Sequence, residues 1–323
     1  MKIMTRIIAL FLSSYGSCYA QGQEQLSPRE LKQKTIVTEP QTLYKGFFRA
    51  GLGLSYGVVN NIFSETGKRV PIDNNARVSS GFIQLGMIYG VTNRLQIEVA
   101  YPYNFGEIKQ SVRYEVPEAD QVGALKWRGV TSGFGDLNIN AAYQIIRDTD
   151  SHPSTTLFVY TTLPTGEKNP TDVKNEREYN RPTGEGEASV EMQLRLRKVR
   201  FPYAYSFFGG YRVNFGGEKM NMFTPLDPTE YSFKSGNSVD VGGYFHFHLN
   251  EWLAVRNTLE VFFFGPDEFD GEKEEESTWA LFYYPGLSFQ LKGFRIDQAV
   301  TMPIAGKLGG ADPSFILLLQ YTF

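Results

Sequence analysis

The chain has 323 residues and a formal net charge of −3, from 32 Lys and Arg against 35 Asp and Glu. An acidic chain without a basic stripe argues against nucleic acid as a partner. Aromatic residues make up 15% of the chain and the mean hydropathy is −0.29. This composition suits either a soluble β-sandwich or a membrane barrel whose strands are apolar only at alternate positions.

The first 20 residues have the layout of a secretory signal peptide. Lys2 and Arg6 form a basic start, an apolar core follows over 7–12, and small residues lead to Ala20. This core is too short to span a bilayer, and no later run approaches the ~18 apolar residues of a membrane helix. We expect cleavage after Ala20, which removes Cys18, the only cysteine. A lipoprotein acylated at Cys18 is the weaker alternative.

Residues 21–44 form a polar N-terminal extension. Ser27 suits a helix N-cap and Pro28 a first helical position, so a short helix over 28–34 is compatible with the sequence. The sequence favours a flexible extension, but it leaves open whether this segment plugs the barrel or lies in the periplasm. Residues 45–323 are expected to form the barrel.

From residue 46 onward the apolar residues recur with a period of two, which is typical of strands with two different faces. Over 187–197, for example, Leu194 and Leu196 alternate with Arg195 and Arg197. Each segment is long enough to cross a bilayer when tilted. The expected strands are 46–59, 81–91, 94–103, 136–146, 155–163, 187–197, 203–215, 238–249, 252–264, 278–291, 294–303 and 314–323.

The connections between these segments alternate in length. Tight turns such as 92–93, 250–251 and 292–293 alternate with polar loops such as 104–132 and 265–277. A Greek-key sandwich has no reason to follow this rule, whereas a membrane barrel has short periplasmic turns and longer external loops. The sequence therefore predicts an all-β fold, a transmembrane up-and-down antiparallel β-barrel of about 12 strands. Its last strand should close against the first.

Aromatic side chains on the outward face cluster near strand ends, where interfacial girdles lie in membrane barrels. The external group is Tyr101, Tyr103, Trp279 and Phe315, and the periplasmic group is Tyr203, Tyr205, Phe245, Phe247, Tyr321 and Phe323.

The inward positions hold charged residues of both signs, which predicts a polar interior rather than an apolar slot. A barrel of this size is narrower than a 16–18-stranded porin, so we expect a small, constricted path. The turn at 250–251 should place Arg256 near His246 or His248. The lumen-lining candidates are Glu98, Asp136, Glu191, Arg195, Arg212, Asp240, His246, Arg256, Glu260, Arg295 and Asp297.

The residue pattern offers little support for catalysis, for a metal or for a cofactor. His246 and His248 share one strand face, but no third metal ligand stands at a convincing spacing. A membrane-embedded lipid hydrolase needs a Ser–His pair at the outer rim, whereas both histidines point inward at the periplasmic end. The acidic run 267–276 suits a solvated external loop, with a divalent-ion site as the weaker alternative.

Two short segments resemble known families. Residues Gly133, Gly135, Asp136, Leu137 and Tyr143, followed by Pro164, Thr165 and Gly166, resemble the pattern of the outer-membrane family named for the meta-cleavage (MetA) pathway of phenol degradation. That resemblance implies a barrel that passes small, often aromatic or hydrophobic compounds, and it brings no catalytic residues. The final residues, ending in Phe323, resemble the signal by which outer-membrane barrels are recognised for insertion.

Taken together, the sequence predicts an outer-membrane channel for uptake of small solutes and no enzyme. The expected partners are outer-membrane lipid and lipopolysaccharide, the barrel-insertion machinery through the strand that ends at Phe323, and a small-molecule solute. An occluded barrel that binds or adheres through its loops is the main alternative.

Overall fold

The computed structural model describes residues 42–72, 76–116, 121–148, 152–168, 173–175, 178–220, 230–274, 276–291 and 293–323. The signal peptide, the helix over 28–34 and most of the polar extension lie outside these residues. The last residues of that extension are described, and they dock on the barrel: Thr42 and Leu43 are buried, and Leu43 N–H donates to Gln96 Oε1 at 2.8 Å. No helix in the described part of the chain has the length and apolar character to cross a membrane.

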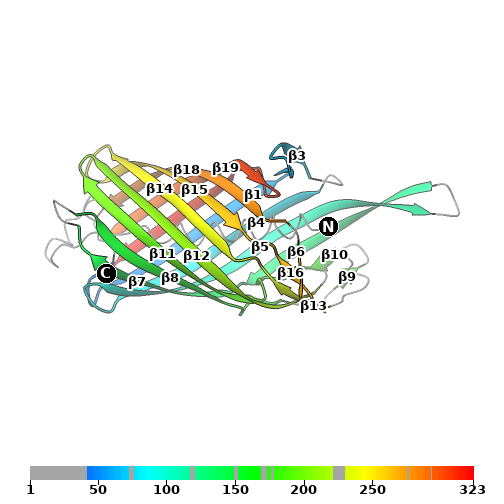
Figure 1. The fold of residues 1–323 in the computed structure, drawn as a ribbon, viewed down its shortest axis with the longest axis horizontal. Helices are drawn as coiled ribbons and strands as arrows, with labels where there is room; N and C mark the ends of the chain where they lie inside the picture. The colour runs from blue at the N-terminus through cyan, green and yellow to red at the C-terminus, as the bar shows by residue number, and fades with distance from the viewer. Residues whose placement is uncertain are drawn as a thin grey trace.

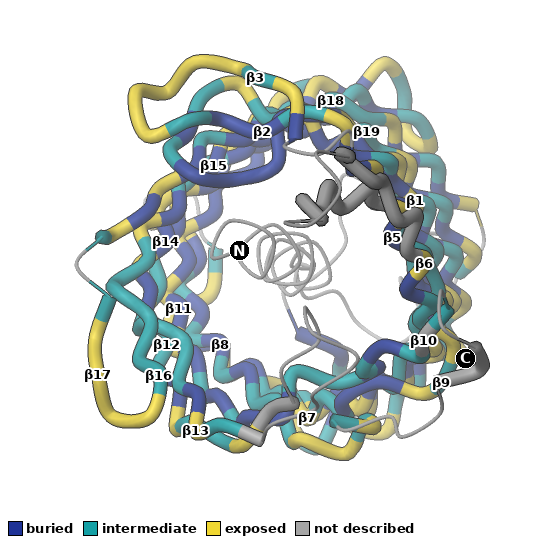
Figure 2. The backbone as a smooth tube through the Cα atoms, turned by 90° about the vertical axis from the view of Figure 1, so that its right-hand side faces the viewer, coloured by how far each residue is buried: buried dark blue, intermediate teal, exposed yellow. Residues whose placement is uncertain are grey.

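The described residues form a closed antiparallel barrel of 12 strands, and the predicted fold class is confirmed (Figure 1). Figure 2 looks along the barrel and shows its wall as a closed ring. In order around the ring the strands are β1 (Phe48–Val59), β4 (Arg77–Gly90), β5 (Leu95–Val116), β7 (Leu137–Ile146), β8 (Ser154–Leu163), β11 (Glu187–Arg200), β12 (Tyr203–Met220), β14 (Ser238–His248), β15 (Leu253–Phe264), β18 (Thr278–Leu291), β19 (Phe294–Lys307) and β20 (Ser314–Thr322).

The last strand closes the barrel against the first, as predicted. β1 and β20 pair from Arg49 opposite Thr322 to Gly57 opposite Ser314. Phe323 N–H donates to Phe48 O at 2.8 Å, and the two rings pack with centroids 5.8 Å apart. Closure matters because an unpaired strand edge in a bilayer leaves backbone polar groups without partners.

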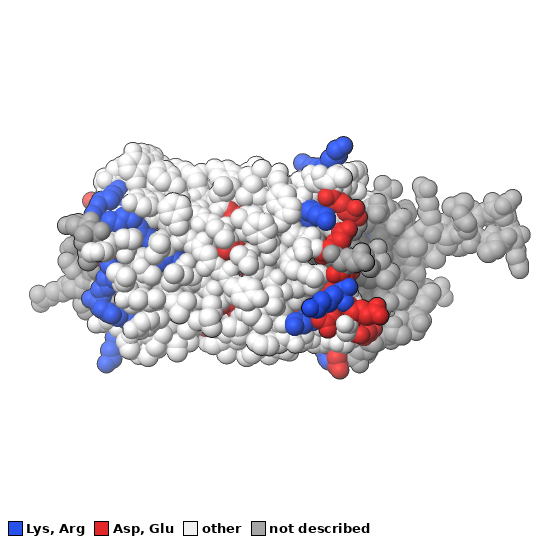
Figure 3. Space-filling model, viewed as in Figure 1, with Lys and Arg blue, Asp and Glu red and all other residues white. Residues whose placement is uncertain are grey.

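The period of two separates an exposed apolar face from a buried inner face. On β11, Leu194 is 46% exposed whereas the next residue, Arg195, is 1% exposed. Figure 3 shows the result on the outside: Lys and Arg gather at the two ends, Asp and Glu at the end with the long loops, and the band between is almost uncharged. A band of this kind matches the hydrocarbon core of a membrane.

Asn257 is among the polar side chains that interrupt this apolar face. Asn257 lies at an outward position of β15, and its Oδ1 accepts a hydrogen bond of 2.5 Å from the Tyr283 hydroxyl on the neighbouring β18. The partner satisfies the amide oxygen, so the break in the pattern does not leave it unpaired against lipid.

The external connections contain more regular structure than expected. The predicted loop 104–132 is a hairpin in which β5 runs on to Val116 and pairs with β6 (Gln121–Phe134). Beyond the membrane both faces of a strand meet water, so an apolar face is not required and the pattern no longer reveals the strand. The other short strands are β2 (Asn61–Phe63), β3 (Arg69–Pro71), β9 (Val173–Asn175), β10 (Glu178–Asn180), β13 (Glu230–Lys234), β16 (Glu268–Phe269) and β17 (Glu272–Lys273).

Candidate functional site

Ten of the lumen candidates occupy buried positions in the phase opposite to the exposed apolar residues, and Arg212 is partly exposed, with 19% of its side chain accessible. Asp136 stands apart from the others, between β6 and β7. The buried ten are Glu98, Asp136, Glu191, Arg195, Asp240, His246, Arg256, Glu260, Arg295 and Asp297.

Five side chains from three adjacent strands form what we call the mid-barrel polar cluster: Glu191, Gln193, Arg195, Arg212 and Asp240. Glu191 Oε2 accepts from Arg212 Nε at 2.9 Å and Nη2 at 2.6 Å. Gln193 links Asp240 to Arg195: its Nε2 donates to Asp240 Oδ2 at 2.9 Å, and its Oε1 accepts from Arg195 Nη2 at 2.5 Å. Because a buried charge is costly unless paired, this network offsets much of its own desolvation.

A second group, the periplasmic-side cluster, consists of Arg256, Ser288, Arg295 and Asp297. Asp297 Oδ1 lies 2.8 Å from Arg256 Nη1, and Asp297 Oδ2 lies 2.7 Å from Arg295 Nε. The Ser288 hydroxyl also donates to Asp297 Oδ1. Arg256 stands directly opposite His246 across the turn between β14 and β15, as predicted. Two guanidinium groups thus share one carboxylate near the periplasmic end.

The inner wall also carries aromatic rings, which the sequence interpretation missed. Phe158 and Tyr160 stack with centroids 6.0 Å apart, and Arg195 Cζ lies 4.7 Å from the centre of the Phe158 ring. A second group on β15 and β18 contains Phe262, Phe282 and Tyr284. The signal was present, because these rings follow the inward phase. The inner wall therefore carries aromatic groups beside the charged networks that the prediction of a polar, salt-bridged interior described.

The two inward histidines, His246 and His248, are buried on β14. His246 Nε2 and both ring nitrogens of His248 are buried without a hydrogen-bond partner. These three ring nitrogens are therefore not hydrogen-bonded to a serine hydroxyl, as the nitrogen of a general base would be. Among the described residues no group of three or more His, Cys, Asp or Glu side chains is placed to hold a metal ion.

The acidic run 267–276 forms a small hairpin in its described part. Asp270 and Gly271 both have positive φ, of 50° and 84°, as the central residues of a type I′ turn require. β16 and β17 pair on either side of this turn. Two of its carboxylates hold neighbouring loops, since Asp267 Oδ1 accepts from Gly236 N–H and Asp270 Oδ1 from Ser232 N–H.

Asp136 ties the outer ends of four strands together. Its Oδ1 accepts from Gly166 N–H at 2.9 Å and its Oδ2 from Glu185 N–H at 2.6 Å. Leu137 N–H donates to Thr165 Oγ1 at 2.9 Å. Asp136 and Leu137, at the start of β7, therefore both hold the segment that follows β8. We call these contacts the outer-rim knot. The Asp136 carboxylate is a structural acceptor here, bound to backbone N–H groups of two loops.

The glycines of the same motif permit close approach. A Cβ on Gly166 would lie 2.6 Å from Gly184 Cα, and one on Gly135 would collide with the Asn104 amide. The remaining motif residues lie outside the knot: Tyr143 is exposed on the outward face of β7, Pro164 is exposed after β8, and Gly133 lies on β6 against Thr183. In this chain the Gly, Asp and Thr residues of the motif thus have structural roles at the outer rim.

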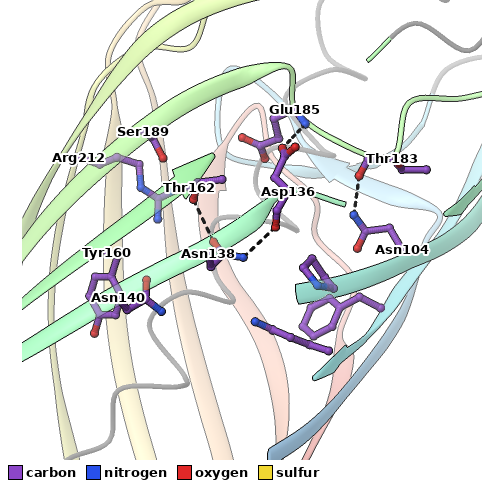
Figure 4. A pocket seen from close by; sticks show the side chains of 13 residues that line it. Asn104, Asp136, Asn138, Asn140, Tyr160, Thr162, Thr183, Glu185, Ser189 and Arg212 are labelled. Carbon is purple, nitrogen blue, oxygen red and sulfur yellow. Dashed lines mark hydrogen bonds between the residues drawn. The ribbon is translucent and has the colours of Figure 1, made fainter. Parts of the chain in front are cut away.

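Beneath the knot lies a pocket of about 110 Å³, shown in Figure 4. Asn138 bridges the knot and the pocket, because its Nδ2 donates to Asp136 O and its Oδ1 accepts from Thr162 Oγ1. We call this the outer-mouth pocket. Its lining residues come from six strands and the segments beside them: Phe82, Gln84, Pro102, Asn104, Asp136, Asn138, Asn140, Tyr160, Thr162, Thr183, Glu185, Ser189 and Arg212.

The fold resembles solved outer-membrane barrels. An outer-membrane channel from Pseudomonas putida F1 shares 16% identity at a TM-score of 0.66, covering 93% of this chain and 100% of that one. The toluene transporter TbuX of Ralstonia pickettii gives 10% identity and a TM-score of 0.44, covering 94% and 95%. No protein-family model matches the sequence, and no curated protein matches it. At these identities the likeness extends to the fold alone.

Proposed function

We propose that this protein is an outer-membrane channel for the uptake of small solutes. The observation that supports the proposal most directly is the pairing of an apolar outer belt with an inner wall of buried charged networks. A closed barrel with this distribution separates a polar interior from lipid, which is the arrangement of porin-type channels. The P. putida F1 channel, similar in fold, is called a channel by name.

The solutes of this channel are proposed to include small aromatic or hydrophobic compounds. The resemblance of the sequence motif around Asp136 to the pattern of the meta-cleavage family supports that class, as do the inward rings Phe158, Tyr160 and Phe262. We also propose that the chain is exported through a cleaved signal peptide, contacts lipopolysaccharide, and is inserted through the strand that ends at Phe323.

The path is proposed to run past the two charged clusters. Asp297 is shared by Arg256 and Arg295, so that point of the wall carries one net positive charge. Replacing both arginines with Ala should enlarge the path and leave the carboxylate uncompensated. The variant should therefore show higher conductance and weaker anion preference than the wild-type protein.

The test is single-channel recording of refolded protein in planar bilayers, with reversal potentials measured in a salt gradient. Lys68→Ala is the matched control, because it removes a cation from the exposed β2–β3 turn at the outer end. Unchanged conductance and selectivity in Arg256→Ala/Arg295→Ala would remove these residues from the conducting path. Absence of conductance in the correctly folded wild-type protein would instead favour an occluded barrel that acts through its loops.

A further inference from the structure

Three cationic residues stand side by side on adjacent strands at the outer end of the barrel. Arg77, the first residue of β4, lies directly opposite Lys109 on β5, and Lys109 lies directly opposite Arg128 on β6. Arg77 is exposed, and the side chains of Lys109 and Arg128 are 57% and 48% accessible. We call these three residues the cation row. Like charges at directly opposed positions destabilise a sheet, so such a row is unfavourable unless anions compensate it.

The carboxylates of the protein compensate the cation row only in part. Glu107 lies 2.6 Å from Lys109 Nζ and 3.0 Å from Arg128 Nε, and Glu178 of β10 lies 3.4 Å from Arg128 Nη1. Arg77 forms no ion pair with any residue that the structure describes. The three cations and these two carboxylates leave one net positive charge, with Arg77 open to an external anion.

The cation row faces outward, on the same side of the wall as the lipid-facing residues. On β4, alternate positions lead from Arg77 to Ile83, which is 43% exposed in the apolar belt. On β5, alternate positions lead from the row to Tyr103, which is also exposed. Val78 and Ile108, which neighbour the row in the opposite phase, are buried. The row therefore lies outside the mouth, above the membrane-facing surface.

Aromatic rings mark the edge of the membrane below the cation row. Tyr103 packs edge-on against Phe134 with centroids 5.5 Å apart, and Phe105 stacks on Tyr56 at 6.4 Å. Outward rings near strand ends are typical of the level of the lipid headgroups. Lys109 lies four residues beyond Phe105 on β5. This separation is about 13 Å along the strand and about 9 Å in height for a strand tilted by ~45°. Long cationic side chains can reach back over part of that height.

From these observations we infer that the cation row binds the phosphate groups of lipid A, the phosphorylated glycolipid that anchors lipopolysaccharide in the outer leaflet. Arginine and lysine are the side chains that bind phosphate, and arginine does so through paired N–H donors. A membrane amphiphile brings its phosphates to this height while its acyl chains contact the apolar belt, whereas a soluble anion gains nothing from the rings below. The inference rests on the proposed outer-membrane function and names the site of its lipopolysaccharide contact.

The test is native mass spectrometry of the full-length protein in detergent micelles, with diphosphoryl lipid A as the probe. This lipid should bind more tightly than the same lipid without its phosphates. Arg77→Gln/Lys109→Gln should weaken its binding about tenfold, because each cation beside an anionic lipid contributes a few-fold. Lys68→Gln/Lys273→Gln is the matched control, since it removes two exposed cations from other loops at the same end of the barrel. Heat-modifiable gel mobility verifies that each variant is folded.

Three outcomes would overturn the assignment: equal binding of the lipid without phosphates, unchanged affinity in Arg77→Gln/Lys109→Gln, or an equal loss in the control variant. Displacement of lipid A by inorganic phosphate would also overturn it, because the row would then be a general anion site. The measurement does not depend on conduction, so it separates the two proposals. Conduction without lipid A binding removes the phosphate site and leaves the channel. Lipid A binding without conduction keeps the site and removes the channel.

Discussion

The membrane-facing belt and the outer rim are stabilised in different ways. In the belt, any apolar residue at alternate positions is compatible with the contact to lipid. The exposed side chains there include Leu85, Phe207 and Met302, which differ in shape. At the rim particular carboxylates, such as Asp136 and Asp312, accept backbone N–H groups from other loops. Lipid imposes a general constraint on polarity, whereas pinning a loop in water requires a specific partner.

The largest effect is expected from a charge placed in the membrane-facing belt. Leu194→Arg puts a charge on the lipid-facing side of β11 and should cost about 2–4 kcal/mol near the bilayer midplane. Arg195→Leu removes an inward charge and should still permit insertion. The measurement is the fraction of heat-modifiable, folded barrel after refolding into lipid vesicles. Equal insertion of both variants would contradict the assignment of faces.

The next largest effect is expected from loss of a hydrogen-bond acceptor in the outer-rim knot. Asp136→Asn keeps the shape of the side chain but leaves one oxygen acceptor for two backbone N–H groups, which should cost about 2 kcal/mol in unfolding free energy. Urea titration of the refolded barrel measures this cost. Thr66→Ala is the control, since Thr66 lies in the exposed β2–β3 turn and its hydroxyl pairs with that of Ser64, within the same turn. A midpoint unchanged from wild type would mean that the knot is dispensable.

The smallest effect is a pH dependence at the same rim. Burial raises the pKa of Asp312, but hydrogen bonds from Asn60 and Asn61 and the charge of Arg69 outweigh it, so the pKa lies below its usual value of 3.8. A depressed folded-state pKa stabilises the protein above the unfolded-state pKa, and this contribution is lost as the pH falls through the folded-state value. Stability should therefore decrease below about pH 4.

Asp312→Asn should remove that part of the pH dependence at a cost of about 1 kcal/mol at neutral pH. The measurement is hydrogen exchange at Asn60 and Asn61 between pH 3 and pH 6, relative to wild type. The same acid sensitivity in the variant would assign it to other groups.

The sequence alone determined the all-β class, the strand segments and the exposed face of each strand. The reason is that a bilayer requires an apolar side chain at nearly every second position. This requirement applies within each strand, so the pattern can be recognised from a short stretch of sequence. The closing pair of β1 and β20 followed too, since an edge cannot remain open in lipid. Even the pairing of His246 with Arg256 was accessible, because a tight turn fixes the register of its hairpin.

Only the tertiary structure decided how the inner wall and the rim are organised. Arg195 and Phe158 are far apart in the sequence, and their contact depends on the pairing of β8 with β11. The partners of Asp136 come from segments 30 and 49 residues away. The hairpin of β5 and β6 was hidden because water on both faces removes the apolar pattern. Such contacts depend on which strands meet, and the alternation within a single strand does not contain that information.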